Sequence, residues 1–493
     1  MRVFMLGWEF PPFISGGLGT ACYGLTKALS RRQAGVTFVL PKVVDSDYSS
    51  HVRLLSPQAP EASDEAYDEH GQPTPAAVAS SYEIDAPAKP GEAADAFENV
   101  SFRAVPSRMS SPYPGTPGSP GGVVAEPNES DPADPSRPIG FINPAASPVP
   151  AANVVTPTEI SPETPPRPQS TRPASSSSGG GGGDDYGGDL TVEAQRYAGL
   201  CVRLSGGEAF DVVHAHDWLT FPAGVAVAAA TGKPLVVHVH STEFDRAGDS
   251  ADSRVVEIER AGCHAAARVI AVSRRTKTTL VERYGVPGDK VTVVYNGIEN
   301  GPANPNVVVP PKIDKDDKIV LFLGRVTMQK GPEYFIGAAK RVVEKIDNVK
   351  FVVAGTGDRI QPMIEQVAAA GLGPKVVFTG FLRGDDVERV FKMADVYVMP
   401  SVSEPFGIAP LEAISHDVPV IMSKQSGVSE VIEHALKVDF WDTDEMANKI
   451  IAVLRHPPLG ATLREQAEVE LRKLTWDGAA AKCVEVYEAA LGR

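Results

Sequence analysis

Short runs of Val, Ile and Leu recur along this chain, and segments with the helical spacing of apolar residues lie between them. Near-continuous apolar strands that alternate with helices indicate parallel strands buried on both faces of a sheet. The run 1–7 is interpreted as a first strand, because Trp8 and Glu9 end it before it reaches the length of a signal peptide. Further strands are expected at 36–40, 212–216, 235–240, 269–272 and 291–295. The pattern predicts an α/β fold with a doubly wound parallel sheet.

The same alternation restarts after a segment rich in Pro and Asn at 300–311. Strands are expected at 319–323, 350–354, 376–379, 396–399 and 418–422, with helices such as 333–346 and 359–370 between them. A chain of 493 residues is long enough for two domains. We therefore expect two Rossmann-like domains, 1–300 and 316–475, facing each other across a cleft, and a helix in 476–493 that packs back on the first. Ligands of such sheets bind beyond the carboxyl ends of the strands.

The segment 106–188 shows neither the helical nor the strand spacing of apolar residues. Eighteen of the 43 prolines of the chain fall between Pro106 and Pro173, and the tract SSSSGGGGG follows them. Such a composition has too little apolar surface to offset the entropy lost on ordering. We expect a long disordered insertion in the first domain, preceded by a strand near 100–105.

The overall composition excludes several classes of protein. The net charge of −15 gives no support to nucleic-acid binding. No stretch approaches the roughly 20 apolar residues of a membrane span. The four cysteines, Cys22, Cys201, Cys263 and Cys483, lie far apart and form no CxxC pair, which fits reduced, buried thiols better than zinc ligands. We expect a cytoplasmic protein without a transmembrane segment.

A glycine-rich loop, Ser15-Gly16-Gly17-Leu18-Gly19, follows the first strand. Glycines let the backbone N–H groups at the start of a helix approach an anion. Such turns are equally common without a ligand, so both interpretations stay open. The loop is not GxGxxG, and no acidic residue clearly ends a strand about 20 residues later, which disfavours a dinucleotide site.

Two cations, Arg325 and Lys330, lie five residues apart on a loop directly after an expected strand. Positive charge there could neutralise a diphosphate and stabilise a departing nucleotide as its negative charge grows. Such a pair is more often solvated surface, but a position beyond a buried strand favours a binding site.

Glu404 and Glu412 bracket a Pro-Phe-Gly turn that runs from an expected strand into a helix. Gly407 and Ile408 would present backbone N–H groups at the start of that helix. The two carboxylates could bind different hydroxyl groups of one ligand. The alternative is that Glu404 only offsets the helix dipole while Glu412 faces solvent; the unusual turn favours the site.

Two expected strands end in histidines, which are His214 and His216 in the segment HAHDW, and His238 and His240 further on. Side chains alternate along a strand, so His238 and His240 share a face, with His238 in the core and His240 at the cleft. A histidine at a strand end is most often a hydrogen-bonded core residue. The spacing does not favour a metal over that interpretation.

Together these motifs resemble those of retaining GT-B glycosyltransferases, in particular family 4 and the glycogen and starch synthases. Glu404 through Glu412 resembles their E-x7-E element, and Arg325 with Lys330 resembles their Arg/Lys pair. The segment WEFPP before the paired glycines resembles their amino-terminal loop, and HAHDW is similar to a segment typical of glycogen and starch synthases. The resemblance covers nearly all of the chain outside the insertion. It implies the GT-B fold and the transfer of a sugar, expected to be glucose, from a nucleotide-sugar to a glycan.

The resemblance also implies roles for residues of the second domain. Arg325 and Lys330 would neutralise the diphosphate of the donor. Glu404 would bind hydroxyl groups of the donor sugar, and Glu412 would bind the ribose hydroxyls. The residues expected to line the sugar and phosphate are Phe406, Gly407 and Ile408.

Across the cleft, Gly16 and Gly17 would lie against the donor diphosphate or an acceptor-side phosphate. His240 would contact the sugar near its anomeric face and primary hydroxyl, and Asp217 would lie near the acceptor. The family is thought to react with retention, because the departing phosphate oxygen takes the proton of the acceptor on the same face. The resemblance thus implies no cofactor beyond the nucleotide-sugar and no metal.

Three alternatives remain open at this point. Ile14 stands where bacterial glycogen synthases that use ADP-glucose carry a lysine, which leaves UDP- and ADP-glucose both possible and supports a family 4 enzyme that makes another glycoside. A NAD-dependent dehydrogenase is disfavoured by the missing GxGxxG motif. A non-catalytic sugar-nucleotide-binding protein is disfavoured by the intact set of His240, Arg325, Lys330 and Glu404.

Overall fold

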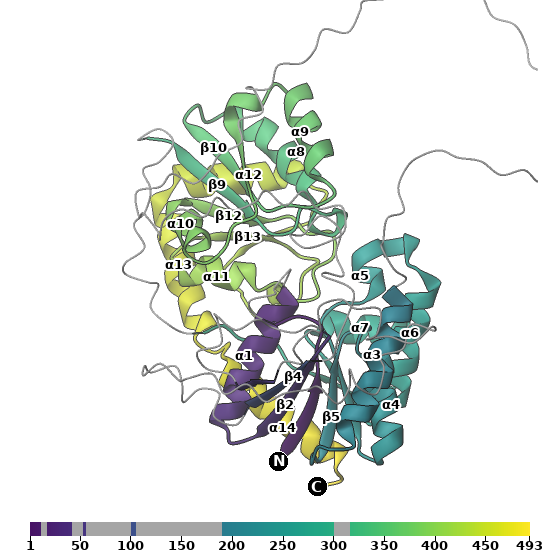
Figure 1. Ribbon diagram of the computed structural model, residues 1–493. Coiled ribbons are helices and arrows are strands. Elements are labelled where there is room, and N and C mark those ends of the chain that lie inside the picture. Colours follow the sequence, from purple (N-terminus) through teal and green to yellow (C-terminus); the bar gives the residue numbers. More distant parts are fainter. Residues whose placement is uncertain (11–16, 42–52, 56–99, 105–189, 300–315) are drawn as a thin grey trace, which may run out of the picture.

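The computed structural model describes residues 1–10, 17–41, 53–55, 100–104, 190–299 and 316–493. These residues form two α/β lobes, one above the other in Figure 1, and each lobe contains one parallel sheet. The predicted fold class, two Rossmann-like domains, is confirmed. The expected insertion, 106–188, and Gly16 of the glycine-rich loop lie outside the described residues.

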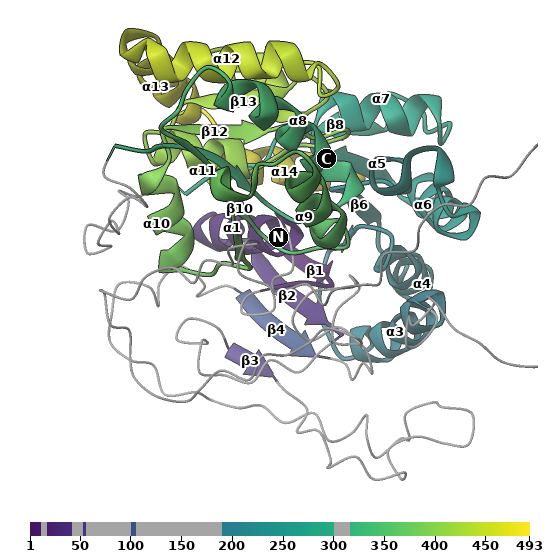
Figure 2. The ribbon, with the colours of Figure 1, turned by 90° about the horizontal axis from the view of Figure 1, so that it is seen from above.

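The first lobe has a sheet in the order β3-β4-β2-β1-β5-β6-β7-β8, in which every pair of neighbours is parallel. Figure 2 shows β1, β2, β4 and β3 side by side in this sequence. The strands of this lobe are β1 (Arg2–Leu6), β2 (Gly35–Leu40), β3 (Arg53–Leu55), β4 (Val100–Ala104), β5 (Val212–His216), β6 (Leu235–Val239), β7 (Arg268–Ala271) and β8 (Val291–Val293).

Helices cover both faces of the first sheet (Figure 1). One face packs against α3 (Leu190–Ser205), α4 (Phe221–Thr231), α6 (Ser253–Ala265) and α7 (Arg274–Glu282). The other face packs against α1 (Gly17–Arg31) and α14 (Trp476–Ala490). Helix α14 is the last of the chain, so the carboxyl-terminal segment crosses from the second lobe to complete the core of the first.

The second lobe has a parallel sheet in the order β11-β10-β9-β12-β13-β14. Its strands are β9 (Lys318–Leu323), β10 (Val349–Ala354), β11 (Val376–Gly380), β12 (Val396–Met399), β13 (Val420–Ser423) and β14 (Leu436–Val438). Helices α8 (Pro332–Val343), α9 (Ile360–Ala369) and α12 (Thr443–Arg455) pack on one face. Helices α10 (Asp385–Met393), α11 (Ala409–Ser415) and α13 (Pro457–Leu471) pack on the other.

The sequence-based boundaries differ from the structure at a few strands. The strand predicted to end at His240 ends at Val239, because the His240 N–H donates to the Asp217 carboxylate (2.6 Å) instead of continuing the ladder. The three-residue edge strands β3 and β14 were not predicted. The strand expected near 100–105 is present as β4.

The two segments that cross between the lobes touch each other. Ile298 pairs with Thr475 in an isolated parallel bridge, and the Ile298 N–H donates to the Leu474 carbonyl (3.0 Å). Among the helices in the described part of the chain, none is both long and apolar enough to cross a membrane.

Candidate active site

A cavity of about 340 Å³ lies between the two lobes, at the carboxyl ends of both sets of strands. This is where ligands bind in open parallel sheets. Every sequence-predicted site residue that the structure describes lines it, which brings together Gly17, Asp217, His240, Arg325, Lys330, Glu404, Phe406, Gly407, Ile408 and Glu412. Gly16 lies outside the described residues.

A lysine–glutamate pair forms the second-lobe wall of the cavity. Lys330 follows β9 and Glu404 follows β12, and these strands are neighbours in the sheet, so the two loops meet. The Lys330 ammonium forms an ion pair with Glu404 Oε2, to which the Ser401 hydroxyl also donates (3.2 Å). The Glu404 side chain is 8% exposed, so removal of Lys330 would leave a nearly buried carboxylate without its ion-pair partner.

The loop that carries Lys330 requires a glycine next to it. Gly331 has φ +60°, and a Cβ atom at this position would lie 2.3 Å from the Pro400 carbonyl oxygen. Only glycine combines this backbone conformation with so close an approach. The tight packing of the two loops holds Lys330 at the cavity, immediately before α8.

Glu412 lies in the first turn of α11, in a partly buried position on the cavity wall. Desolvation raises the pKa of its carboxyl to about 7. Because ligand binding near neutral pH would then involve both protonation states, this carboxyl is a candidate origin of pH dependence.

Asp217 holds the backbone at His240. It is a non-glycine residue with φ +56°, and its Oδ1 accepts from the N–H groups of His240 (2.6 Å) and Ser241 (3.3 Å). Burial raises the pKa of Asp217 to about 7, against the opposing effects of Arg246 and of these two N–H groups. Asp217, which was predicted to lie near the acceptor, lines the cavity, but one of its oxygens orients the loop that carries His240.

His240 lies beside a second histidine that sequence reasoning did not assign to the site. Nδ1 of His216 is 2.9 Å from Nε2 of His240, so one of the two rings donates to the other. Desolvation lowers the pKa of His240 to about 3, so the ring is neutral near neutral pH. Glu9, which follows β1 and is 4% exposed, also lines the cavity and was not predicted.

Hydrogen bonds also join the two lobes directly. The Ser403 hydroxyl of the second lobe donates to Asp245 Oδ1 of the first (2.7 Å). The Glu430 carboxylate accepts from the backbone N–H groups of Arg274 (2.9 Å) and Arg275 (2.8 Å), at the start of α7. These contacts join residues more than 150 positions apart, and no local pattern could have signalled them.

Three family models match successive parts of the chain. Residues 2–82 match the starch synthase catalytic domain, and residues 193–300 match glycosyltransferase family 4. Residues 306–470, which include Arg325, Lys330, Glu404 and Glu412, match glycosyl transferases group 1.

Several curated proteins are similar in sequence. A glycosyltransferase of Methanocaldococcus jannaschii is 35% identical over 304 residues, which are 58% of this chain and 77% of that protein. A D-inositol 3-phosphate glycosyltransferase of Salinispora tropica is 27% identical over 62% of this chain and 67% of its own length. A glycogen synthase of Mycobacterium tuberculosis is 26% identical over 57% and 69%.

Solved structures with the same two-lobed GT-B arrangement cover almost the whole chain. The sucrose-phosphate synthase of Thermosynechococcus elongatus has a TM-score of 0.64 at 16% identity, and covers 100% of this chain and 99% of its own. The Anabaena protein HepE, in complex with UDP and glucose, has a TM-score of 0.60 at 15% identity over 99% and 100%. These likenesses show the fold.

Proposed function

This chain belongs to the family 4 and group 1 glycosyltransferases, and we propose that it is a retaining enzyme that transfers glucose from a nucleotide-sugar to an α-glucan. One observation carries the proposal most. Two cations of the second lobe, Arg325 and Lys330, line one cavity together with His240 of the first lobe. The match of residues 2–82 to the starch synthase catalytic domain and the glycogen synthase relative support a glucan acceptor.

The cavity suits a leaving group whose negative charge grows as the glycosidic bond breaks. Cations in a site that excludes water stabilise such charge more strongly than they could in bulk solvent. Lys330 and Arg325 supply two cations on one loop. Lys330 and Ser401 both contact Glu404 Oε2, so Oε1 can accept a hydrogen bond from a hydroxyl of the donor sugar.

Front-face retention needs no protein carboxylate as a nucleophile, unlike retaining glycoside hydrolases. In the route we propose, the departing phosphate oxygen accepts the proton of the acceptor hydroxyl, while His240 binds the sugar. Oδ1 of Asp217, a first-lobe carboxylate of the cavity, is used to hold the backbone of His240 and Ser241. We therefore propose that Asp217 lies near the acceptor and that its role is to orient His240.

A second candidate is a transferase that acts on a small polar acceptor. The D-inositol 3-phosphate glycosyltransferase relatives, at 27% identity, favour this candidate, as does Ile14 at the position where ADP-glucose-dependent glycogen synthases carry lysine. The proposed α-glucan and a small acceptor differ in size and charge, so a direct screen separates them.

A screen of donors and acceptors tests the proposal. The full chain is incubated with UDP-, ADP- and GDP-sugars, each with glycogen, maltooligosaccharides or inositol phosphate, and the released nucleoside diphosphate is measured. We expect UDP- or ADP-glucose to be consumed with a glucan, and NMR of the product to show an α-linkage. Transfer to inositol phosphate alone would support the second candidate, and a β-linkage would contradict retention. Donor binding without turnover would identify a non-catalytic sugar-nucleotide-binding protein.

The raised pKa of the Glu412 carboxyl predicts how the affinity for the donor depends on pH. The ionised carboxylate can accept from both ribose hydroxyls, whereas the protonated form has lost an acceptor site. With a pKa of about 7, the ionised fraction falls from about 90% at pH 8 to about 10% at pH 6. We expect the dissociation constant of a nucleotide-sugar to rise five- to tenfold over this range, as measured by calorimetry without acceptor. A Glu412→Gln variant should bind with little pH dependence, and an unchanged profile in that variant would assign the titration to another group.

A further inference from the structure

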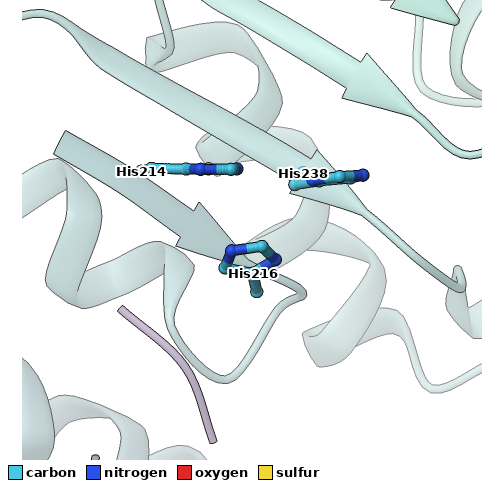
Figure 3. A group of neighbouring side chains, drawn as sticks. All are labelled: His214, His216 and His238. Atoms are coloured by element: carbon cyan, nitrogen blue, oxygen red, sulfur yellow. The ribbon is translucent and has the colours of Figure 1, made fainter. Parts of the chain in front are cut away.

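Four histidines form one group, of which His240 lines the cavity. His214 and His216 lie on β5, His238 lies on β6 directly opposite His216 in the register, and His240 follows β6. Ring centroids are 4.3 Å apart for His214 and His216, and 4.2 Å apart for His238 and His240. Figure 3 shows the rings of His214 and His238 edge-on and nearly parallel, with an angle of 7° between their planes and with His216 next to both.

The ring nitrogens of this group divide into two kinds. Nδ1 of His214 lies 2.7 Å from the Tyr487 hydroxyl of α14, and Nδ1 of His216 lies 2.9 Å from Nε2 of His240. Nε2 of His214, Nε2 of His216, both nitrogens of His238 and Nδ1 of His240 are buried and have no hydrogen-bond partner among the described residues. Buried polar atoms are nearly always paired with protein, water or an ion, so this concentration of unpaired nitrogens points to an occupant.

We propose that His214, His216 and His238 bind one divalent transition-metal ion such as Zn²⁺. One nitrogen from each of the three rings lies within 4.8 Å of the other two. Zinc binds imidazole nitrogen at about 2.0–2.1 Å, which places the nitrogens of a tetrahedral site about 3.4 Å apart. Binding would therefore bring the ring nitrogens closer together by up to about 1.4 Å.

The partners of the other nitrogens fit the surroundings of a metal site. A histidine that binds a metal through one nitrogen usually has its second nitrogen bonded to an outer partner, which fixes the tautomer and the ring orientation. Tyr487 is such a partner for His214, and His240 is such a partner for His216. The three ligands are all imidazoles, which select Zn²⁺, Ni²⁺, Co²⁺ or copper over Mg²⁺ and Ca²⁺.

The ion would act on the active site through His216. An ion bound to Nε2 leaves the proton of the neutral His216 ring on Nδ1, which then donates to Nε2 of His240. The proton of His240 is consequently on Nδ1. The ion therefore acts as a positioning element for His240, and it also ties α14 to β5 through Tyr487, outside the chemistry of sugar transfer.

The metal content of the untagged full chain tests this inference. Because all three ligands are buried, the ion must enter as the lobe folds, so the protein is produced in minimal medium with Co²⁺ or Zn²⁺ and then passed over a chelating resin. We expect about one equivalent of metal per chain by mass spectrometry, and visible absorption bands of nitrogen-coordinated Co²⁺. A folded wild-type chain without a stoichiometric ion would overturn the inference and would leave ordered water as the occupant.

Variants locate the ion without reference to activity. His214→Gln and His238→Gln should each lose the bound Co²⁺ and its absorption bands. The matched control is His434→Gln, because His434 is an exposed histidine paired with Glu470, and this variant should keep both. Tyr487→Phe removes only an outer partner, so this variant should keep the ion and shift its absorption spectrum. It therefore tests the site even if the ligand variants fail to fold. Metal retained in both ligand variants would contradict the assignment.

Discussion

Replacing Lys330 by alanine is expected to lower the turnover number by about 10²–10³-fold, the loss typical when one preorganised charge-stabilising group is removed. Lys330 projects into the cavity between the lobes from the loop after β9, and its partner Glu404 is nearly buried. In the proposed reaction the variant would lose the cation beside the departing diphosphate, and it also leaves the Glu404 carboxylate without its ion-pair partner. Turnover is measured as release of nucleoside diphosphate at saturating donor and acceptor.

A lysine at the other end of the same strand is the matched control for Lys330. Lys318 begins β9 and pairs with Asp395 (3.3 Å), far from the cavity lining, so Lys318→Ala should keep wild-type turnover. Glu404→Ala should lose turnover to a similar extent as Lys330→Ala. Because the two side chains act as one unit, the double variant should lose much less than the product of the single losses. Near-normal turnover in folded Lys330→Ala protein would contradict the assignment of the cavity.

Much of the fold could be predicted from the sequence because buried parallel strands carry their signal locally. Strands β5 and β12 match the predicted limits residue for residue, since each is a short apolar run with a clear end. Strands β3 and β14 have only three residues each, and neither stands out as a pattern, whereas the equally short β8 lies in the run of β-branched residues predicted at 291–295. Their pairing depends on the sheet edge that is already present.

Some contacts of the candidate site could likewise be predicted from the sequence, and others could not. Lys330 and Glu404 are 74 residues apart, yet they could be expected together, because parallel strands bring their following loops to one edge of the sheet. The contact of His216 with His240 could not be predicted, since it depends on the register that sets His216 opposite His238. The hydrogen bond from Ser403 to Asp245 depends on how the two lobes pack, and no sequence motif predicts that packing.

Helix α14 offers the largest expected change in stability. Trp476 opens the helix, is 5% exposed, and packs in the core formed by α1 and the first sheet. Its ring lies directly against α1, since a Cβ atom on Gly24 would be 2.2 Å from the ring. Truncating a buried tryptophan removes its apolar contacts and leaves a cavity, which costs about 3–5 kcal/mol. Trp476→Ala is therefore expected to lower the free energy of unfolding of the first lobe by this amount.

Hydrogen exchange resolved to individual strands can measure this loss of stability in the first lobe alone. A thermal unfolding curve of the whole two-lobed chain cannot separate the lobes. Amides of β1 and β5 should exchange about 10²–10⁴-fold faster in Trp476→Ala, whereas those of β9 and β12 should change little. The control is Trp441→Ala, because Trp441 is 58% exposed on the second lobe and contributes little buried surface. If β1 and β5 kept their protection without Trp476, α14 would contribute little to the first lobe. Loss of protection confined to this lobe would instead show that the carboxyl-terminal helix stabilises the half of the molecule that carries His240.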